Sequence, residues 1–515
     1  MEFLQNIKPR EYQEKITQTC LEKNCLVVLP TGMGKTLIAL MVAIKRLEKF
    51  PLSKILILAP TKPLAEQHLE SFKKNLPELY VDIQLFTGSV NAKKRKEIWK
   101  TANIIFSTPQ CVANDLKKKL YDLSEVSLLV EDEAHRCVKN YDYNYAAKRY
   151  LEQAINPRMM GLTASPGSDS KKITEICRNL SIEEVELRTR ESPDVIQYLQ
   201  ELEFTKKTVP FPPEFQEIKL ILKKIYDEYI QSLRAKNFLF GTDNKITLIK
   251  LQTQISSQIQ RGYKSPSSYS AMSDCAQAIK LVHAIELLET QTLQSFHNYL
   301  KDLYKQAEKQ QSKGVVRLVA RKEFNVAFAY ANQLLEDGVE HPKVREIIKI
   351  AKVEILKNLK SKILIFTQFR DTAKIVSERL NKIPEINAKV FVGQAKKKGM
   401  GLSQKEQKKT IEDFKENKTN ILVATCIAEE GLDIPEVNMV IFYEPVSSAI
   451  RSIQRRGRTA RLTKGKLVIL ITEKTKDEYS YYASRSREKK MHKSIEEVKT
   501  ALKNKTAYEK QSKLK

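Results

Sequence analysis

The stretch CLVVLPTGMGKTLIALMVAIKRL, residues 25–47, decides the fold of this 515-residue chain. An apolar run of strand length, 25–30, leads through a short glycine-containing loop into an apolar run of helix length. Backbone N–H groups of such a loop can surround phosphate oxygens, and the N-terminus of the following helix adds its dipole. The pattern therefore predicts a strand–loop–helix unit that binds nucleotide phosphates.

Within PTGMGKT, residues 30–36, Lys35 is expected to reach the β- and γ-phosphates and Thr36 to hold Mg²⁺. Leu29 stands where the full phosphate-loop pattern has its first glycine, so an ordinary turn before a helix is the alternative interpretation. The residues predicted to line the nucleotide here are Thr31, Gly32, Met33, Gly34, Lys35 and Thr36.

Apolar runs of strand length alternate with helical patterns on either side of this unit. Such alternation predicts a parallel sheet covered by helices on both faces. The first set of expected strands is 25–30, 54–60, 82–86, 103–109, 128–133 and 159–166. A second set follows near the C-terminus at 362–368, 388–393, 420–426, 439–445 and 466–472. The chain is therefore expected to be an α/β protein with two parallel-sheet domains.

The segment between the two sets has helical spacing and is predicted to be an all-helical insertion. VPFPPEF, 209–215, marks its start, 262–274 is expected to be a loop inside it, and a helix over 342–359 leads out of it. We expect a solvated basic tail at the end of the chain, with a frayed helix as the alternative. The expected divisions are 1–204, 205–345, 346–483 and 484–515.

The composition favours a folded protein with a polyanionic partner. Lys and Arg number 89 against 62 Asp and Glu, a net charge of +27, and neutralising phosphates releases condensed counterions. A merely solubilising surface is the alternative interpretation. The seven cysteines are scattered without a CxxC pair, which favours a reducing compartment over disulfides or a zinc site. No signal-like or membrane-spanning run occurs, so a cytoplasmic protein without membrane contact is expected.

EDEAHR, residues 131–136, ends an apolar run about a hundred residues after the phosphate loop. Carboxylates at a strand end can serve a nucleotide site in two ways. Asp132 is expected to bind the Mg²⁺ shell, and Glu133 to polarise the attacking water. His135 is expected to couple this site to the rest of the protein, although a satisfied core histidine is the alternative.

QRRGRTAR, residues 454–461, lies in the second α/β domain. Its arginines can neutralise charge on a transferring γ-phosphate if that domain closes against the first. Arg458 and Arg461, three residues apart, would share a helix face. A basic nucleic-acid patch is the alternative, and the two roles can coexist if Arg455 or Arg456 faces outward.

With PTGMGKT, DEAH, TAS (163–165), ATCIAEEGLDIP (424–435) and QRRGRTAR in this order, the chain resembles superfamily 2 helicases. The runs GLSQKEQ (401–407), EEGLDIPEVNMVIFYEP (429–445) and SAIRSIQRRGRTAR (448–461) are most similar to the archaeal Hef and Fanconi anaemia M branch. The resemblance spans roughly residues 3–480. It implies two RecA-like domains, ATP and Mg²⁺ as cofactors, and translocation on branched or forked DNA in repair or fork processing.

The resemblance also implies roles for single residues. Gln13 matches an adenine-reading glutamine, Gly431 and Asp433 lie near the ribose, and Gln454 senses the γ-phosphate. Thr163 and Ser165 match the motif that links hydrolysis to domain closure. Implied contacts to the nucleic-acid backbone are, in the first domain, Pro60, Thr61, Lys62, Thr87, Gly88, Thr108 and Pro109, and, in the second, Gln368, Gly393, Gln394 and Thr425.

Three features depart from the family pattern. Ala460 stands where glycine is more usual, which a helix should tolerate. Glu131 adds a carboxylate just before the DEAH box, with an effect on Mg²⁺ binding that the sequence leaves open. Related proteins commonly continue into a nuclease region that this sequence lacks, so no nuclease activity is expected, and a separate nuclease or clamp partner is possible.

Other function classes remain as rivals. An RNA-directed motor shares all these motifs, because the family has RNA-sensing relatives. A clamp that uses ATP only to close on nucleic acid is disfavoured by the intact Lys35, Glu133 and Arg458. A phosphate-loop metabolic kinase leaves the second α/β domain and its arginines unexplained.

Overall fold

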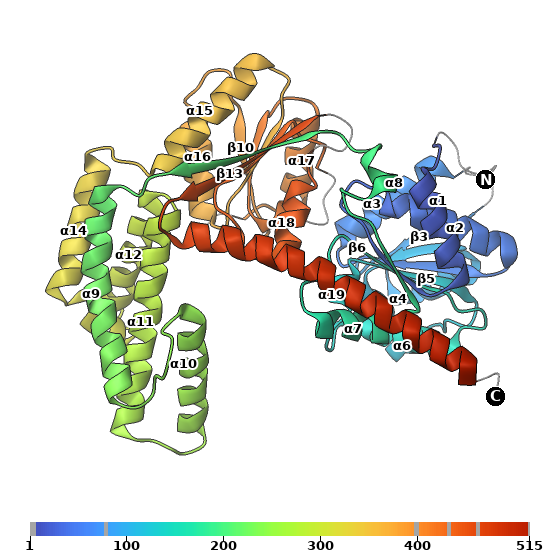
Figure 1. Ribbon diagram of the computed structural model, residues 1–515, viewed down its shortest axis with the longest axis horizontal. Coiled ribbons are helices and arrows are strands. Elements are labelled where there is room, and N and C mark those ends of the chain that lie inside the picture. The colour runs from blue at the N-terminus through green and yellow to red at the C-terminus, as the bar shows by residue number, and fades with distance from the viewer. Residues whose placement is uncertain (1–6, 77–80, 396–400, 430–433, 460–463, 513–515) are drawn as a thin grey trace.

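The computed structural model describes residues 7–76, 81–395, 401–429, 434–459 and 464–512. Two parallel sheets and a helical bundle make up these residues, as expected, and Figure 1 shows the bundle beside the second sheet. No helix within the described ranges is both long and apolar enough to cross a membrane.

The first sheet has seven parallel strands in the order β3-β4-β2-β5-β6-β1-β7. Its central strands are apolar and fully buried because helices cover both faces. The strands are β1 (Cys25–Val28), β2 (Lys54–Leu58), β3 (Ile83–Phe86), β4 (Ile104–Ser107), β5 (Val126–Asp132), β6 (Met159–Thr163) and β7 (Glu184–Leu187). The helices are α1 (Glu11–Glu22), α2 (Lys35–Lys49), α3 (Lys62–Asn75), α4 (Ala92–Thr101), α5 (Pro109–Lys117), α6 (Asp142–Gln153), α7 (Ser170–Asn179), α8 (Pro193–Ile196) and the short η1 (Ala134–Arg136).

The second sheet has six parallel strands in the order β10-β11-β9-β12-β13-β8. Its strands are β8 (Leu202–Val209), β9 (Ile363–Phe366), β10 (Ala388–Phe391), β11 (Ile421–Ala424), β12 (Met439–Phe442) and β13 (Gly465–Thr472). Its helices are α15 (Pro342–Lys357), α16 (Arg370–Leu380), α17 (Gln404–Lys415), α18 (Ala449–Arg456) and the short η2 (Cys426–Ala428).

The bundle between the sheets has its own core. Phe215, Leu222 and Phe296 are fully buried there, among side chains spaced at helical intervals. Its helices are α9 (Pro213–Ala235), α10 (Lys245–Gln260), α11 (Pro266–Thr290), α12 (Leu293–Glu308), α13 (Lys313–Val319) and α14 (Lys322–Glu336). The prediction of a loop over 262–274 is wrong from residue 266 onward, where the structure has a helix. Pro266 begins α11, with the Ser265 hydroxyl accepting a hydrogen bond from the Ser268 N–H.

The second sheet includes a strand, β8, that the sequence pattern did not predict and that precedes the helical bundle in the chain. Residues 202–209 pair in parallel with β13 along its whole length and form the edge of the second sheet. The expected boundary at residue 204 therefore falls inside a strand. The polar sequence LEFTKKTV hides this strand because an edge strand exposes much of its surface to solvent.

The final segment is one long helix, α19 (Lys476–Ser512), so a solvated tail is the wrong interpretation. Met491, Ile495 and Val498 are buried in the core of the first domain. Charged residues dominate the composition of 484–515, while the apolar residues at helical spacing bury one stripe. Figure 1 shows α19 running from beside the second sheet across to the first.

Candidate ATP and nucleic-acid sites

The loop after β1 has the backbone that a phosphate cradle needs. Gly32 and Gly34 have φ angles of 85° and 79°, in the region that favours glycine. A side chain at Gly34 would also overlap the amide of Gln13. Gly34 is the N-cap residue of α2, so the helix begins at Lys35 and its first N–H groups lie at the loop. The Lys35 ammonium donates a hydrogen bond to the Leu29 carbonyl at 2.9 Å.

Gln13 of α1 lies against this loop. Its side-chain amide donates to the Met33 carbonyl at 3.2 Å, and the Tyr12 hydroxyl donates to the same oxygen at 2.8 Å. The Arg10 N–H donates to the other end of the Gln13 amide at 2.9 Å. Because both ends of the amide are held, Gln13 is fixed beside the nucleotide loop rather than exposed as a surface residue.

Asp132 ends β5 and meets the phosphate loop through His68 of α3. His68 Nε2 lies 2.7 Å from the Asp132 carboxylate, and His68 Nδ1 lies 3.3 Å from the Thr36 hydroxyl. The imidazole can donate from Nε2 to the Asp132 carboxylate while its Nδ1 faces the Thr36 hydroxyl. Burial would raise the pKa of the Asp132 carboxyl, but His68 and Lys35 outweigh it and lower that pKa. Sequence reasoning missed His68, because a single histidine on a helix has no distinctive spacing.

Glu133 has a left-handed backbone, with a φ of 53°, that turns its side chain away from β5. Its carboxylate lies 3.2 Å from His135 Nδ1, which in turn lies 3.3 Å from the Thr163 hydroxyl at the end of β6. The Ser165 N–H donates to that hydroxyl at 3.1 Å. The DEAH and TAS segments thus form one connected cluster of side chains.

Glu131 has a different environment from Asp132. Consecutive residues of a strand face opposite sides of the sheet, and Glu131 faces the α6 side. The Cys137 thiol donates to its carboxylate at 2.9 Å. Complete burial raises the pKa of Glu131 to about 8. The extra carboxylate therefore lies apart from the cluster of Thr36, His68 and Asp132.

The nucleic-acid candidates of the first domain all follow β2, β3 or β4, which are neighbours in the sheet. Thr61 and Thr108 are the N-cap residues of α3 and α5, and Gly88 is exposed with open space around it. Lys62 makes a long ion pair of 3.6 Å with Glu66. Pro60 is half-buried, whereas Thr87 and Pro109 are buried, so these residues could offer mainly backbone groups to a ligand.

The candidates of the second domain follow β9, β10 and β11, again three neighbouring strands. Gln368 and Gln394 are exposed, whereas Thr425 is buried. The Arg370 guanidinium donates to the Gly393 carbonyl at 3.1 Å and holds the loop after β10. In each sheet, the nucleic-acid candidates therefore lie at the carboxyl ends of three neighbouring strands.

The QRRGR segment meets the phosphate loop across the domain interface. A side chain at Gly457 would overlap Thr31, so only glycine allows this approach. Gln454 and Arg458 are buried near the interface, and Arg458 donates to the Glu429 carbonyl at 2.9 Å. Gly431, Asp433 and Arg461, and also Ala460, lie outside the described residues.

Arg455 is not the outward-facing arginine that the sequence allowed. It is completely buried, pairs with Glu429 at 2.7 Å and lies over the rings of Phe366 and Phe442. Arg456 is the partly exposed one, and it pairs with Glu488 of α19. The difference arises because α18 turns its 455 side toward the second sheet.

The residues expected to hold Mg²⁺ suit that ion chemically. Mg²⁺ prefers oxygen ligands and is usually held by one or two carboxylates together with substrate phosphates. The Thr36 hydroxyl and the Asp132 carboxylate supply such oxygens and contact the same imidazole from either side. Within the described residues no group of three or more His, Cys, Asp or Glu forms a metal site on its own.

Three family models match successive parts of the chain. A DEAD/DEAH box helicase model matches residues 10–173, and a helicase conserved C-terminal domain model matches 342–463. Between them, 214–338 match the model of the helical bundle of an ATP-dependent RNA helicase. The division of the matches follows the two sheets and the bundle.

Whole-chain relatives agree with these matches. A Methanocaldococcus jannaschii protein named as an ATP-dependent RNA helicase, MJ1505, is 38% identical over 487 residues, covering 94% of this chain and 60% of its own length. The Fanconi anemia group M protein homolog of Mus musculus is 32% identical over 533 residues, covering 95% of this chain. This chain spans only 26% of that relative.

A solved structure covers nearly the same ground. The crystal structure of the Pyrococcus furiosus Hef helicase domain has 41% sequence identity and a TM-score of 0.72, covering 94% of this chain and 100% of that chain. The shared fold, the shared motifs and this degree of identity lead to one assignment. The chain belongs to the superfamily 2 helicases, in the family that includes the Hef helicase domain and the Fanconi anemia group M proteins.

Proposed function

We propose that this chain is an ATP-dependent helicase or translocase that acts on branched or forked DNA. The observation that carries the proposal is that the ATP-site residues and the nucleic-acid candidates follow different, neighbouring β-strands of the same sheet. In the first sheet, ATP-site residues follow β1, β5 and β6, and the nucleic-acid candidates follow the adjacent β2, β4 and β3. A movement at the ATP site can therefore be transmitted to bound nucleic acid through the ends of neighbouring β-strands.

The ATP site would bind its substrate mainly through the loop after β1. Lys35 would exchange the Leu29 carbonyl for phosphate oxygens, and Gln13 would lie beside the base. Gly431 and Asp433 are proposed to approach the ribose. Thr36 and Asp132 would hold Mg²⁺, which neutralises charge on the phosphates when bound.

Hydrolysis would require both domains. Glu133 would orient and polarise the attacking water, as a positioned carboxylate can. Gln454, Arg458 and Arg461 of the second domain would stabilise charge that develops on the γ-phosphate. Thr163, Ser165 and His135 would link this step to domain closure, because they form one contact cluster with Glu133.

The DNA assignment rests on relatives rather than on base-reading groups. An ATP-dependent DNA helicase of Schizosaccharomyces pombe, fml1, is 31% identical over 492 residues, and the mouse relative is a Fanconi anemia group M protein homolog. The excess of basic residues suits phosphate contacts that carry no sequence preference. A separate nuclease or clamp partner and a cytoplasmic location remain parts of the proposal.

An RNA substrate is the second candidate. It is favoured by the name of the Methanocaldococcus jannaschii relative and by the RNA-helicase model that matches the bundle. An ATP-gated clamp without productive hydrolysis is a third. The strand-end contacts themselves do not separate DNA from RNA, since backbone phosphates are common to both.

Steady-state ATP hydrolysis with a panel of polymers separates these candidates. The assay compares no polymer, single-stranded DNA, duplex DNA, forked DNA and structured RNA at equal nucleotide concentration. The proposal expects forked DNA to stimulate turnover most. Stronger stimulation by structured RNA would reassign the substrate, and binding of forked DNA without stimulation by any polymer would indicate a clamp.

A further inference from the structure

Helix α19 connects all three parts of the molecule. It starts beside the bundle, where the Lys476 N–H donates to Glu289 of α11 at 3.2 Å. It then packs against α18 and β13 of the second domain, and its far half packs against α7 and β7 of the first. Figure 1 shows this one helix passing from one domain to the other. A single helix packed against both domains links the position of one domain to that of the other.

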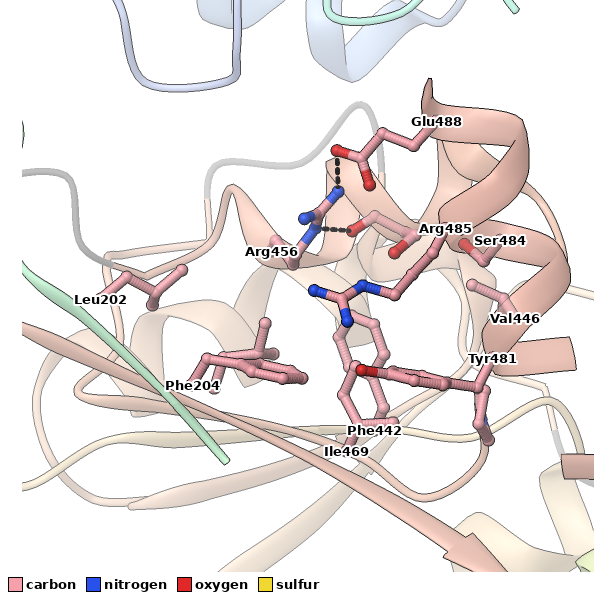
Figure 2. Close-up of a pocket in the computed structure, with 13 residues that line it drawn as sticks. Leu202, Phe204, Phe442, Val446, Arg456, Ile469, Tyr481, Ser484, Arg485 and Glu488 are labelled. Carbon is pink, nitrogen blue, oxygen red and sulfur yellow. Dashed lines mark hydrogen bonds and ion pairs between the residues drawn. The ribbon is translucent and has the colours of Figure 1, made fainter. Parts of the chain in front are cut away.

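On the second domain, Glu488 of α19 contacts the QRRGR segment. Its carboxylate pairs with the Arg456 guanidinium at 2.6 Å, and Arg456 also donates to the Ser452 carbonyl at 3.3 Å. Figure 2 shows the Arg456–Glu488 pair beside a pocket. Arg456 directly precedes Gly457, which abuts Thr31 of the phosphate loop. The pair therefore fixes α18 at the point where the two domains meet.

On the first domain, Met491 of α19 contacts the TAS segment. Its side chain is 2% exposed, and the Ser165 hydroxyl donates to its sulfur at 2.8 Å. Ser165 holds the Thr163 hydroxyl, which lies next to His135 and so connects to Glu133. An unbroken series of contacts thus leads from α19 to the carboxylate proposed to activate water.

We propose that α19 is a coupling strap for ATP hydrolysis, and that Glu488 and Met491 are its positioning residues. Glu488 would hold the QRRGR segment, and Met491 would hold the TAS segment, in the mutual position that hydrolysis requires. The inference rests on the proposed function. It assigns a role in turnover to a helix that carries none of the helicase motifs.

Two other residues of α19 allow docking of the helix to be tested separately from coupling. Ile495 and Val498 are buried in the same core of the first domain as Met491, but their hydrocarbon side chains cannot accept a hydrogen bond from Ser165. They supply apolar burial, which stabilises the docked helix. A purely structural strap would depend on them as much as on Glu488 and Met491.

The test measures ATP hydrolysis by the full chain with saturating forked DNA. Glu488→Gln removes the charge of the ion pair, and Met491→Leu keeps volume while removing the sulfur acceptor. We expect each to lower kcat about tenfold with the KM for ATP within about twofold, since the substitutions reduce stabilisation of the transition state and leave ATP binding intact. Ile495→Val is the matched control, and we expect it to shorten a buried side chain with little change in kcat.

A second pair of variants separates positioning from loss of fold. Arg456→Glu should lower kcat as Glu488→Gln does, and combining it with Glu488→Arg should restore most of the activity by reversing the ion pair. Thermal unfolding of every variant is measured alongside. Unchanged kcat in both Glu488→Gln and Met491→Leu, or losses that follow unfolding temperature and include Ile495→Val, would overturn the strap. Absence of DNA-stimulated hydrolysis in the unmodified chain would instead overturn the proposed function.

Discussion

Glu131, Asp132 and Glu133 show how three consecutive carboxylates acquire three environments. The strand turns Glu131 and Asp132 to opposite faces, and the left-handed backbone at Glu133 sends the third side chain elsewhere. Glu131 meets a thiol, Asp132 meets His68, and Glu133 meets His135. Only the last two groups can therefore share a nucleotide site.

At this scale, Glu133→Gln should separate ATP binding from ATP hydrolysis. The amide keeps the size of the side chain but cannot polarise water, while Asp132 keeps its charge. We expect hydrolysis to be lost and ATP affinity to stay within about tenfold, or 1.4 kcal/mol, of the unmodified chain. Equilibrium binding of a fluorescent ATP analogue, run beside the hydrolysis assay, measures both. A collapse of affinity together with turnover would show that Glu133 has a structural role.

The placement of the motif residues at strand ends and at the start of a helix was predictable at this scale, because it follows from local sequence chemistry. The glycines of the phosphate loop indicate a positive φ, and an acidic residue after an apolar run indicates the end of a strand. His68 and Arg455 were not predictable. The role of each depends on which distant side chain faces it, Asp132 in one case and Glu429 in the other.

Among the elements, α15 begins at a junction where the bundle, the second domain and α19 meet. Its N-cap residue His341 is fully buried and accepts a hydrogen bond from the Lys343 N–H at 3.2 Å. Lys343 forms a buried ion pair with Asp477 of α19. Burial, followed by the nearby Lys343 charge, lowers the pKa of His341 to about 3.

This histidine should make the junction sensitive to acid. Above pH 6.5 both folded and unfolded chains hold it neutral, but below that the unfolded chain binds a proton that the folded chain refuses, so stability falls toward pH 3. His341→Asn keeps an N-cap acceptor without titrating. Between pH 7.5 and 5, the free energy of unfolding measured in urea should fall by about 2 kcal/mol less in the variant than in the unmodified chain. Equal losses would mean that His341 is protonated in the folded state.

The bundle gives a prediction about branched substrates. Residues 205–345 carry 21 Lys and Arg against 14 Asp and Glu, on a segment that the ATPase chemistry does not need. Four exposed lysines of α9 and of the α12 end are candidates for duplex phosphates: Lys223, Lys224, Lys305 and Lys309. Reversing their charge should weaken forked-DNA binding and flatten its salt dependence by about 0.9 log units for each phosphate no longer neutralised.

The matched control reverses four exposed lysines elsewhere on the first domain: Lys15, Lys148, Lys171 and Lys172. Fluorescence anisotropy across a salt series measures both variants on forked and single-stranded DNA. Hydrolysis driven by saturating single strands should survive in the bundle variant. Equal weakening on both substrates, or no weakening, would make the bundle a spacer.

Elements with a pure pattern were predictable, and elements with a mixed pattern were not. The eleven apolar runs are all strands in the structure. The edge strand β8 is half polar, α11 begins in a segment rich in serine, and the buried stripe of α19 lies among many charges. In these three cases tertiary contact decides the structure, which single-chain patterns reflect only weakly.

For the molecule as a whole, the proposed catalytic site is divided between domains that meet at Gly457 and Thr31. Arg458→Ala should therefore leave ATP binding within about threefold while lowering hydrolysis by about 10²–10³-fold, as loss of a charge-stabilising group does. Arg379→Ala, which removes an exposed arginine of α16 that pairs with Glu340, is the control. An unaltered rate in Arg458→Ala would remove this arginine from the site.

The full chain is needed for that experiment. A first domain produced alone would lack Met491, Ile495 and Val498, which complete its core. Its hydrolysis rate would then reflect exposed apolar surface as well as the missing arginines.

The most direct test of the central claim follows the fate of a labelled DNA fork with ATP and Mg²⁺. The unmodified chain and Lys35→Ala are compared with ATP, with a non-hydrolysable analogue and without nucleotide. The proposed mechanism predicts that the unmodified chain separates or migrates the fork only with ATP. Lys35→Ala should bind the fork but leave it unchanged, with its unfolding temperature in the absence of nucleotide close to that of the unmodified chain. Remodelling by Lys35→Ala, or ATP hydrolysis by the unmodified chain without any remodelling, would contradict it.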